Sequence, residues 1–369
     1  MRDLKPGTTV VVAMSGGVDS SVAAAFLLQQ GMRVIGVTMK TYDFEDQHRR
    51  PRNETSCCGL GAVHDAKMVA AGLAIPHYTL DLRKEFEHEV IDVFVSEYMR
   101  GRTPNPCIAC NREIKWGALL GKAESLGASY LATGHYARIR HDPGSGRMVI
   151  SRARYHPKDQ SYALWSVPQE ALARTLFPLG EMTKPEVRTA ATGLGLRTAD
   201  KQESFDICFV EDNDYTRFLT ERDPSLAQRV AGGPLQRNGQ VVGQHRGTPF
   251  YTIGQRKGIG AHGGKMYVTG LDADSNTVRI GPDADLWRSA LNARSVYWSG
   301  WARPNAPVTV TARVRYSDEA TEAVVTMTDG DSAEVRFTEP KRAITPGQSV
   351  VFYHGDDLVG GGIIDTVHP

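Results

Sequence analysis

The segment that most constrains this chain is Ser15-Gly16-Gly17-Val18-Asp19-Ser20-Ser21, which lies between an apolar strand-like run and a helix-like run. Two glycines let the backbone approach a ligand closely, the serines offer hydroxyls, and a helix N-terminus offers amides without intrahelical partners. This combination predicts a loop that binds phosphate groups. The loop lacks the Gly-Lys-Ser/Thr ending of the Walker loop, so the sequence places no lysine there for the β and γ phosphates. A capped Gly-Gly turn without a ligand is the simpler alternative.

Around this loop, the first third of the chain alternates strand-like and helix-like stretches. Short apolar runs rich in β-branched or aromatic residues predict buried parallel strands at residues 10–13, 33–39, 77–82 and 130–133. Apolar residues at helical spacing and glycine stops predict helices at residues 20–30, 86–98 and 111–126. The expected fold class is α/β, with a doubly wound parallel sheet whose ligands bind beyond the carboxyl ends of the strands.

The composition changes after about residue 223. Between Pro224 and Leu271 the chain has no Asp or Glu, six Lys or Arg residues and eleven glycines. A basic segment of this kind suits the binding of phosphates. A solvated linker is the alternative, although Phe250, Tyr251 and Ile253 are more apolar than a linker needs.

From about Trp287 onward, apolar and polar residues alternate over several short runs, and turn signals such as Pro346-Gly347 separate them. This pattern predicts a small antiparallel β-barrel. We therefore expect a catalytic domain at residues 1–212, a small basic glycine-rich domain at 213–286 and a C-terminal barrel domain at 287–369.

Length and charge narrow the class of protein. At roughly 150 residues per domain, 369 residues correspond to two or three domains. The longest apolar run, Val22 to Leu28, is far shorter than the roughly 20 residues of a membrane helix, and the N-terminus has no hydrophobic signal region. We expect no membrane partner and a cytoplasmic location. Because 43 Lys and Arg balance 42 Asp and Glu, only local charge can indicate a nucleic-acid partner.

Five cysteines are an odd number for a chain without an export signal, which disfavours a structural disulfide framework. Cys110 precedes the helix expected at 111–126, and a helix N-terminus makes a thiol more nucleophilic. Cys107, Cys110 and the remote Cys208 are too few for a four-cysteine zinc site. A redox pair, a three-thiolate iron–sulfur site and two catalytic thiols remain open. Cys57 and Cys58 receive no role beyond that of small apolar side chains.

Seven motifs in order now carry a resemblance that covers nearly the whole chain: SGGVDSS, TPNPCIACNREIKWG, ATGHYAR, KDQSY, ICFV, YTIGQRKGIG and the β-rich C-terminus. The first resembles the pyrophosphate loop of N-type ATP pyrophosphatases, which cleave ATP between its α and β phosphates. The whole set is similar to the tRNA-specific 2-thiouridylases, bacterial enzymes that thiolate uridine 34 of tRNA.

The resemblance implies a role for each matching residue. Cys110 matches the family's nucleophile and Cys208 its persulfide carrier. The matching ATP-binding residues are Ala13, Met14, Ser15, Gly16, Gly17, Val18, Asp19, Ser20, Met39 and Gly134. Asn105, Pro106 and Cys107 would line the pocket for the target base, and further tRNA contacts would come from His135, Lys158, Asp159, Gln160, Arg315, Tyr316 and Gln348. Asp19 could contribute to binding Mg²⁺. Some family members carry Asp where Cys107 stands, so Cys107, Cys110 and Cys208 could instead hold a [4Fe-4S] cluster.

The implied reaction is ATP-dependent adenylation of the uridine O2, followed by displacement of AMP by sulfur from a cysteine persulfide. The implied partners are tRNAs for lysine, glutamate and glutamine, and a cysteine desulfurase or sulfur-relay protein. Two alternatives remain open: a ligase that adenylates a small-molecule carbonyl for attack by ammonia, and an RNA-binding protein without catalysis. Pyrophosphate release from ATP, with and without bulk tRNA, distinguishes the three.

Overall fold

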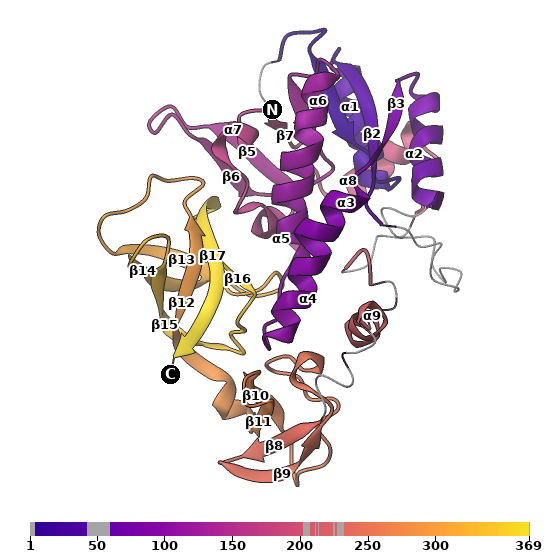
Figure 1. The fold of residues 1–369 in the computed structure, drawn as a ribbon. Helices are drawn as coiled ribbons and strands as arrows, with labels where there is room; N and C mark the ends of the chain where they lie inside the picture. The colour runs from indigo at the N-terminus through magenta and orange to yellow at the C-terminus, as the bar shows by residue number, and fades with distance from the viewer. Residues whose placement is uncertain are drawn as a thin grey trace.

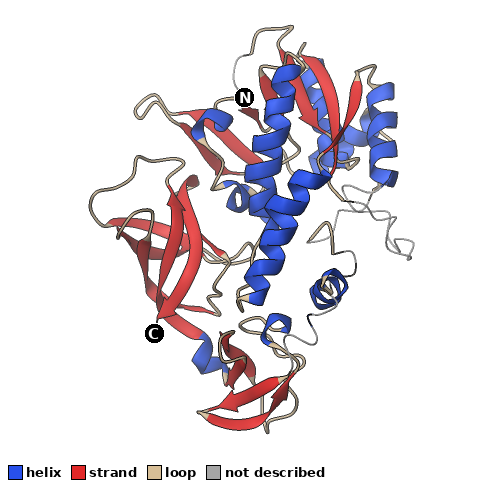
Figure 2. Cartoon of the chain, in the orientation of Figure 1, coloured by secondary structure: helices blue, strands red, loops and turns tan. Residues whose placement is uncertain are grey.

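The computed structural model describes residues 4–42, 60–201, 207–210, 212, 214–223, 226 and 232–368. Three β-sheets lie in different parts of the molecule, with helices gathered around one of them (Figures 1 and 2). Within the described residues, no helix has both the length and the apolar character needed to cross a membrane. Cys57 and Cys58 lie outside the described residues.

The first sheet has five parallel strands in the order β3-β2-β1-β4-β7. They are β1 (Thr9–Ala13), β2 (Arg33–Lys40), β3 (His77–Asp81), β4 (Tyr130–Ala132) and β7 (Thr175–Leu176). The chain builds outward from β1 to β3 and then returns to the other side of β1 with β4, so the order reverses between β1 and β4. This confirms the doubly wound parallel sheet, and it places the ligand site at the carboxyl ends of β1 and β4.

Alternate side chains of β1 belong to different hydrophobic cores. Val11 lies in one buried cluster and Val10 and Val12 lie in another, and all three are fully buried. Successive side chains of a strand point to opposite faces, so both faces of this sheet must be covered by other elements. That is the reason why the strand is an unbroken apolar run.

The helices of this domain follow the expected alternation with the sheet. Helix α1 ends where Gly31 takes a positive φ of 79°, which confirms the predicted stop. The helical segments that precede the central sheet are α1 (Val18–Gln29), α2 (Leu60–Gly72), α3 (Arg83–Phe86), the π-helix η1 (Glu87–Ile91), α4 (Asp92–Met99), α5 (Pro106–Ala109), the π-helix η2 (Cys110–Leu119), α6 (Leu120–Ser125), α7 (Gln169–Leu172), α8 (Lys184–Gly193) and α9 (Tyr215–Arg222), with short 3₁₀ turns η3 (His156–Lys158) and η4 (Ser161–Leu164).

The helix that carries Cys110 corrects the sequence prediction. A start at Asn111 was expected, but α5, η2 and α6 follow one another without a break from Pro106 to Ser125. Asn105 is the N-cap and its side chain accepts a hydrogen bond from the backbone of Cys107. Asn at the N-cap followed by Pro at the first position is a strong helix start, and it outweighs the later signal. Cys110 therefore lies one turn inside the helix, and its backbone N–H already bonds to the carbonyls of Pro106 and Cys107.

The central basic segment is folded rather than a linker. It forms a four-stranded sheet in the order β10-β11-β8-β9, with β8 (Gly233–Arg237), β9 (Gln240–His245), β10 (Tyr267–Asp272), β11 (Thr277–Gly281) and the 3₁₀ turns η5 (Thr248–Phe250) and η6 (Asp283–Leu286). Phe250 and Tyr251 are 7% and 3% exposed, which a solvated linker would not allow.

The last sheet closes into a barrel, as predicted. Its strands are β12 (Trp287–Tyr297), β13 (Val308–Arg313), β14 (Thr321–Met327), β15 (Ala333–Arg342), β16 (Ser349–His354) and β17 (Asp357–His368). Strand β12 pairs with both β15 and β17, which closes the ring.

One part of the barrel sheet comes from the first domain, and the sequence analysis did not foresee it. The hairpin β5 (Ala137–His141) and β6 (Met148–Arg152) pairs with β17 through Ser151 and Asp357. The segment immediately after β4, and hence after the ligand edge of the parallel sheet, is thus joined to the C-terminal barrel by backbone hydrogen bonds.

Candidate nucleotide and thiol site

The glycine-serine loop leaves β1 at the point where the strand order reverses. Its start is tied to β2, because the Met14 amide donates to the Val37 carbonyl and the Thr38 hydroxyl donates to the Met14 carbonyl, each at 2.8 Å. The Ser20 hydroxyl accepts from the Ser15 amide at 3.2 Å, which folds the loop over the start of α1. Gly17 is the N-cap of α1 and provides no side-chain cap. The first-turn amides of α1 therefore face the loop without a side-chain acceptor, as an anion site requires.

Two glycines make this loop fit its surroundings. Gly16 has a φ of 67°, and a Cβ there would lie 2.2 Å from the Ala62 carbonyl oxygen of α2. Gly134 follows β4, and a Cβ there would lie 2.7 Å from the Ser20 amide nitrogen. Both positions therefore need glycine for close backbone approach. The ATP-binding residues predicted on β1 and β4 lie together at the switch point.

The remaining predicted ATP residues differ in accessibility. Ala13, Met14 and Val18 are 8%, 2% and 4% exposed, so their side chains belong mainly to the core. Met39 is partly buried near the end of β2 and packs against the core cluster that contains Val37. These four residues shape the site, whereas Ser15 to Gly17 and Asp19 to Ser20 supply its polar atoms.

Asp19, in the first turn of α1, has two partners that its sequence position did not suggest. Lys184 Nζ lies 2.7 and 2.8 Å from the two carboxylate oxygens of Asp19, and the Tyr136 hydroxyl donates to Oδ1 at 2.7 Å. Lys184 is the first residue of α8 and only 7% exposed. Lysine in the first turn opposes the helix dipole. A lysine directly after the Thr183 N-cap was thus the only local signal of a specific partner, and it does not identify that partner.

A second lysine reaches the loop from the other side. Lys201 Nζ lies 3.2 Å from the Gly16 carbonyl oxygen and 2.7 Å from Asp65 Oδ2 on α2. Arg197 also approaches Asp65, at 3.5 Å. The loop itself contains no lysine, but the fold brings two ammonium groups to it from residues 184–201. No sequence pattern near the loop could have indicated them, because the two segments are more than 160 residues apart.

These contacts bear on the predicted metal sites. Both carboxylate oxygens of Asp19 are engaged by Lys184, so Asp19 does not offer an open ligand for Mg²⁺ in this arrangement. Within the described part of the chain, no three His, Cys, Asp or Glu side chains are grouped as metal ligands. Cys107 is exposed, whereas Cys110 and Cys208 are partly buried. The geometry of these residues therefore does not fit a protein-held Mg²⁺ cage or a three-thiolate cluster.

The two predicted catalytic thiols both contact one large hydrophobic cluster, which extends through all three domains. Cys110 opens the π-helix η2, and Cys208 lies in the short described segment 207–210. Both are half-buried and pack against the same hydrophobic cluster, where Phe209 contacts Phe86 and Phe94 edge to face. Cys107 is exposed. That Cys110 and Cys208 come together during sulfur transfer stays a prediction.

The TPNP segment before these thiols is held by three parts of the molecule. The Thr103 amide donates to the Pro346 carbonyl at 2.8 Å, and the Gln348 amide donates to the Thr103 carbonyl at 2.9 Å. The Thr103 hydroxyl donates to the hydroxyl of Thr252 in the central domain at 3.2 Å. Arg102 pairs with Glu97 and with Asp365 of β17. Gln348 was predicted to contact tRNA; here it holds the segment that leads to Asn105 and Pro106.

His135 links the thiol helix to the residues that follow β4. Its Nδ1 lies 2.7 Å from the Thr133 hydroxyl, and its Nε2 lies 3.5 Å from Lys115 Nζ, which in turn donates to Asn111 at 2.8 Å. Burial, and then the charge of Lys115, lower the pKa of His135 well below its usual value. Since Lys115 can only donate, neutral His135 accepts at Nε2 and carries its proton on Nδ1.

Two residues of the KDQSY motif, Asp159 and Gln160, form hydrogen bonds within the protein, although both were predicted to contact tRNA. Gln160 bonds to both the amide and the carbonyl of Tyr136, at 2.9 Å each. Asp159 is 5% exposed; it accepts from the Ala153 and Ser161 amides and lies 3.4 Å from Arg313 of β13. Buried in this way, Asp159 can influence RNA only through neighbours. Lys158 is half-buried, and its predicted contact with tRNA stays a prediction.

Arg315 and Tyr316 lie in the loop between β13 and β14. Tyr316 is 44% exposed and meets the buried Tyr162 edge to face, with ring centroids 6.3 Å apart. Arg315 donates to the Arg342 carbonyl at 3.2 Å. An exposed aromatic ring beside an arginine suits stacking with a base, so these two predicted tRNA residues have the required exposure.

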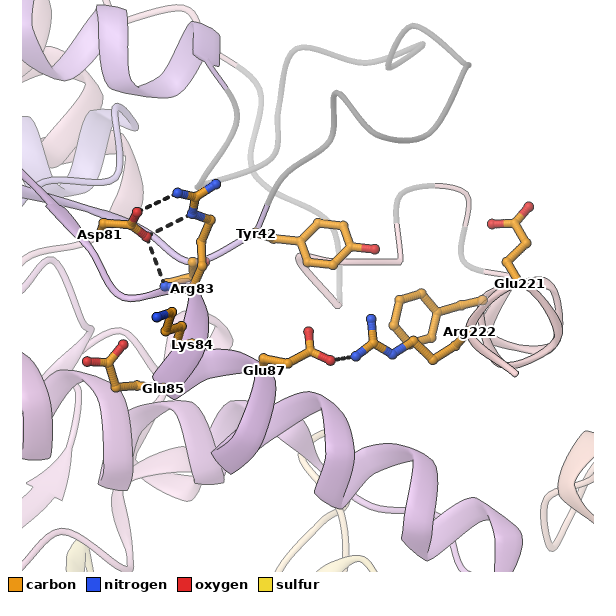
Figure 3. A pocket seen from close by; sticks show the side chains of 10 residues that line it. Tyr42, Asp81, Arg83, Lys84, Glu85, Glu87, Glu221 and Arg222 are labelled. Atoms are coloured by element: carbon orange, nitrogen blue, oxygen red, sulfur yellow. Dashed lines mark hydrogen bonds and ion pairs between the residues drawn. The ribbon is translucent and has the colours of Figure 1, made fainter. Parts of the chain in front are cut away.

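A cavity of about 730 Å³ opens between α3 and α9 (Figure 3). Thr41 and Tyr42 after β2 and Asp81 at the end of β3 line one wall, and Glu221 and Arg222 of α9 line another. Its charges are largely paired, since Arg83 bonds to Asp81 and Arg222 pairs with Glu87. It shares no residue with the predicted ATP set, so we assign it no ligand.

Fold and site together define a class of protein: a nucleotide-binding α/β domain with a phosphate loop at its switch point, followed by two β domains. The sequence comparisons agree. Residues 8–212 match the family described as "tRNA methyl transferase HUP domain", residues 226–282 its "PRC-barrel domain", and residues 288–364 the "Aminomethyltransferase beta-barrel domain".

Two relatives are similar over almost their whole length. The chain is 53% identical over 359 residues to a protein of Heliobacterium modesticaldum, covering 96% of this chain and 92% of the relative. It is 47% identical over 361 residues to a protein of Salinibacter ruber, covering 97% and 94%. Both are named tRNA-specific 2-thiouridylase MnmA. This chain belongs to the tRNA-specific 2-thiouridylase family.

Among solved structures, a 4-thiouridine synthetase bound to RNA and ATP matches with a TM-score of 0.37 and 20% identity, covering 59% of this chain and 51% of that one.

Proposed function

We propose that this protein catalyses the ATP-dependent 2-thiolation of uridine 34 in tRNA, and that it is a tRNA-uridine 2-sulfurtransferase. The observation that carries the proposal is identity of 47–53% over nearly the whole chain to relatives named tRNA-specific 2-thiouridylase. The phosphate loop at the switch point and the two half-buried thiols supply the chemical groups that such a reaction needs.

The first step is activation of the base. The uridine O2 attacks the α-phosphorus of ATP, pyrophosphate leaves, and O2 becomes part of an AMP leaving group. Ser15 to Gly17 and the first turn of α1 hold the phosphates, and Gly134 lets them sit close to the backbone. Holding ATP and the base together can lower the activation barrier by up to ~7–11 kcal/mol through proximity alone. Mg²⁺ bound with ATP would neutralise part of the charge on its phosphates.

The second step transfers sulfur. Cys208 carries a persulfide, received from a cysteine desulfurase or a relay protein. The Cys110 thiolate attacks the inner sulfur, the S–S bond of the persulfide breaks, and a Cys110–Cys208 disulfide forms. The hydrosulfide released attacks C2 of the adenylated uridine, and AMP leaves with the oxygen. A dithiol reductant restores both thiols before the next turnover.

Surfaces around the nucleotide loop and the two thiols bind the RNA. Asn105 to Cys107 line the pocket for the extruded base, and leaving the anticodon stack costs the base a few kcal/mol, roughly. Arg315, Tyr316 and Lys158 contact the RNA directly, whereas Asp159, Gln160, His135 and Gln348 act through the segments they hold. The acceptors are the tRNAs for lysine, glutamate and glutamine, and the protein works in the cytoplasm.

The deciding experiment incubates the protein with ATP, bulk tRNA and a desulfurase with cysteine. Nucleotide products are separated by chromatography, and uridine 34 is analysed by mass spectrometry. We expect AMP and pyrophosphate, both dependent on tRNA, and 2-thiouridine at position 34. Recovery of ADP and phosphate, or pyrophosphate release without tRNA, would refute the proposal; the second result would favour a small-molecule ligase.

A parallel measurement addresses the thiols. Iron content and activity are measured for aerobically purified wild-type protein and for Cys107→Ala. We expect full activity without iron, and the additional sulfur mass on the peptide that contains Cys208. Activity that requires iron, with no persulfide on Cys208, would contradict the persulfide assignment.

A further inference from the structure

The loop that binds the phosphates contains no cation, yet two ammonium groups lie against it. Lys184 Nζ is 2.7 Å from Asp19 in the first turn of α1, and Lys201 Nζ is 3.2 Å from the Gly16 carbonyl near the start of the loop. They come from the start of α8 and from the segment that follows that helix. The two side chains thus approach the loop at two separate points.

Each lysine is held by a carboxylate. Lys184 is 8% exposed at its side chain and pairs with Asp19, which is 31% exposed. Lys201 and Asp65 are 17% and 20% exposed at their side chains and lie 2.7 Å apart. Removing a charge from water costs free energy unless a partner neutralises it, so partly buried lysines beside an anion site need such partners when no phosphate is present.

We propose that Lys184 and Lys201 are further ATP-binding residues, which neutralise the pyrophosphate portion of ATP in place of the lysine that the loop lacks. Asp19 and Asp65 then neutralise the two ammonium groups until nucleotide binds. The inference rests on the ATP-dependent function proposed above and assigns the β and γ phosphates to these two side chains.

The chemistry of lysine and the position of Lys201 support a role in phosphate binding. A lysine near a phosphate chain acts as a compact point charge with three N–H donors, which suits it to several phosphate oxygens at once. Lys201 already donates to a backbone carbonyl of the loop, so its ammonium group lies at the loop rather than at a distant surface. The carboxylate of Asp65 competes with phosphate for the same ammonium group.

This competition separates a binding role from a merely structural salt bridge. If Lys201 and Asp65 only stabilise the fold, removing either partner weakens the site in the same direction. If Lys201 binds pyrophosphate, Lys201→Met weakens pyrophosphate binding, whereas Asp65→Asn frees the lysine and strengthens it. The two substitutions then have opposite signs.

The experiment measures the binding of inorganic pyrophosphate and, separately, of AMP to the full-length protein by isothermal titration calorimetry. We expect Lys201→Met and Lys184→Met each to weaken pyrophosphate binding about tenfold or more, as expected for a lost hydrogen bond to a charged group. AMP binding should change by less than about twofold, because AMP carries neither the β nor the γ phosphate. Asp65→Asn should tighten pyrophosphate binding by about two- to fivefold.

The matched control is Lys67→Met, an exposed lysine on the same helix as Asp65, which should leave both affinities unchanged. Thermal unfolding of each variant separates folding defects from binding. Equal weakening of AMP and pyrophosphate, or weakened pyrophosphate binding in Asp65→Asn, would overturn the assignment. If the proposed reaction itself were wrong, wild-type protein would release ADP in the assay above, whatever the lysine variants bind.

Discussion

Replacing Gly134 with alanine tests whether the switch point holds the nucleotide. In Gly134→Ala, the added Cβ would lie 2.7 Å from the Ser20 amide nitrogen and 2.9 Å from the Asp19 carbonyl carbon. Ordinary contact begins at 3.4 Å, so the start of α1 must move away from the β4 loop by 3.4 − 2.7, or about 0.7 Å. Both obstructing atoms are backbone, and no side-chain rotamer change can relieve the contact.

Overpacking of this kind costs ~1–3 kcal/mol. Since the displaced atoms are the first-turn amides that face the phosphates, we expect most of this cost to appear as weaker ATP binding. At about 1.4 kcal/mol per tenfold change, the dissociation constant for ATP should rise by roughly 5- to 150-fold. The melting temperature should fall by only a few degrees, because most of the core does not touch this contact.

The assay is calorimetric titration of ATP together with tRNA-dependent pyrophosphate release. Gly121→Ala is the control: it lies in α6, nothing approaches its Cβ within 4 Å, and alanine favours helix over glycine. Wild-type ATP affinity in Gly134→Ala would refute the reasoning. A large fall in melting temperature with unchanged ATP affinity would instead show that the contact serves folding alone.

Three further predictions concern the thiols, the basic domain and His135. Cys110→Ala and Cys208→Ala should each abolish 2-thiouridine formation but leave pyrophosphate release measurable, because activation of the base needs no thiol; loss of pyrophosphate release would contradict this. Reversing the exposed Arg256 and Lys257 to Glu should weaken binding of all tRNAs alike, and should flatten the dependence of log affinity on log salt by about one unit per lost phosphate contact; equal affinity at two salt concentrations would contradict a tRNA-binding role. His135 has a lowered pKa in the folded protein, so its contribution to stability is present above the unfolded-state pKa near 6.5 and is lost as pH falls below it. Urea unfolding should therefore show a smaller loss of stability between about pH 7 and pH 5 in His135→Gln than in wild type. Equal losses would exclude this histidine as the cause.

Much of the fold followed from local patterns. Strands β1, β2 and β4 were predicted to within a residue or two, because buried parallel strands are apolar on both faces and stand out from the helices between them. The alternating strands of the barrel were equally visible. The predicted start of the helix that carries Cys110 was wrong, because the prediction began the helix at Asn111 and did not use the N-cap signal of Asn105 followed by Pro106.

Other features depend on pairings between distant segments. The hairpin β5–β6 joins the barrel through hydrogen bonds to β17, more than 200 residues later, and no local pattern encodes that partner. Similarly, Asp159 was predicted to contact tRNA, but it is buried and pairs with Arg313. Sequence indicates that a residue is polar, but only packing decides whether solvent or the protein satisfies it.

The sequence by itself determined the phosphate loop, because a short string holds the glycines, the serines and the helix start that an anion site requires. It also predicted which cysteines react, through the family resemblance that the motifs around Cys110 and Cys208 carry. Only the tertiary structure decided which cations serve the loop. Lys184 and Lys201 lie beside it because α8 packs against α1 and the chain then returns to α2, and electrostatic partners are set by distance in space rather than along the chain.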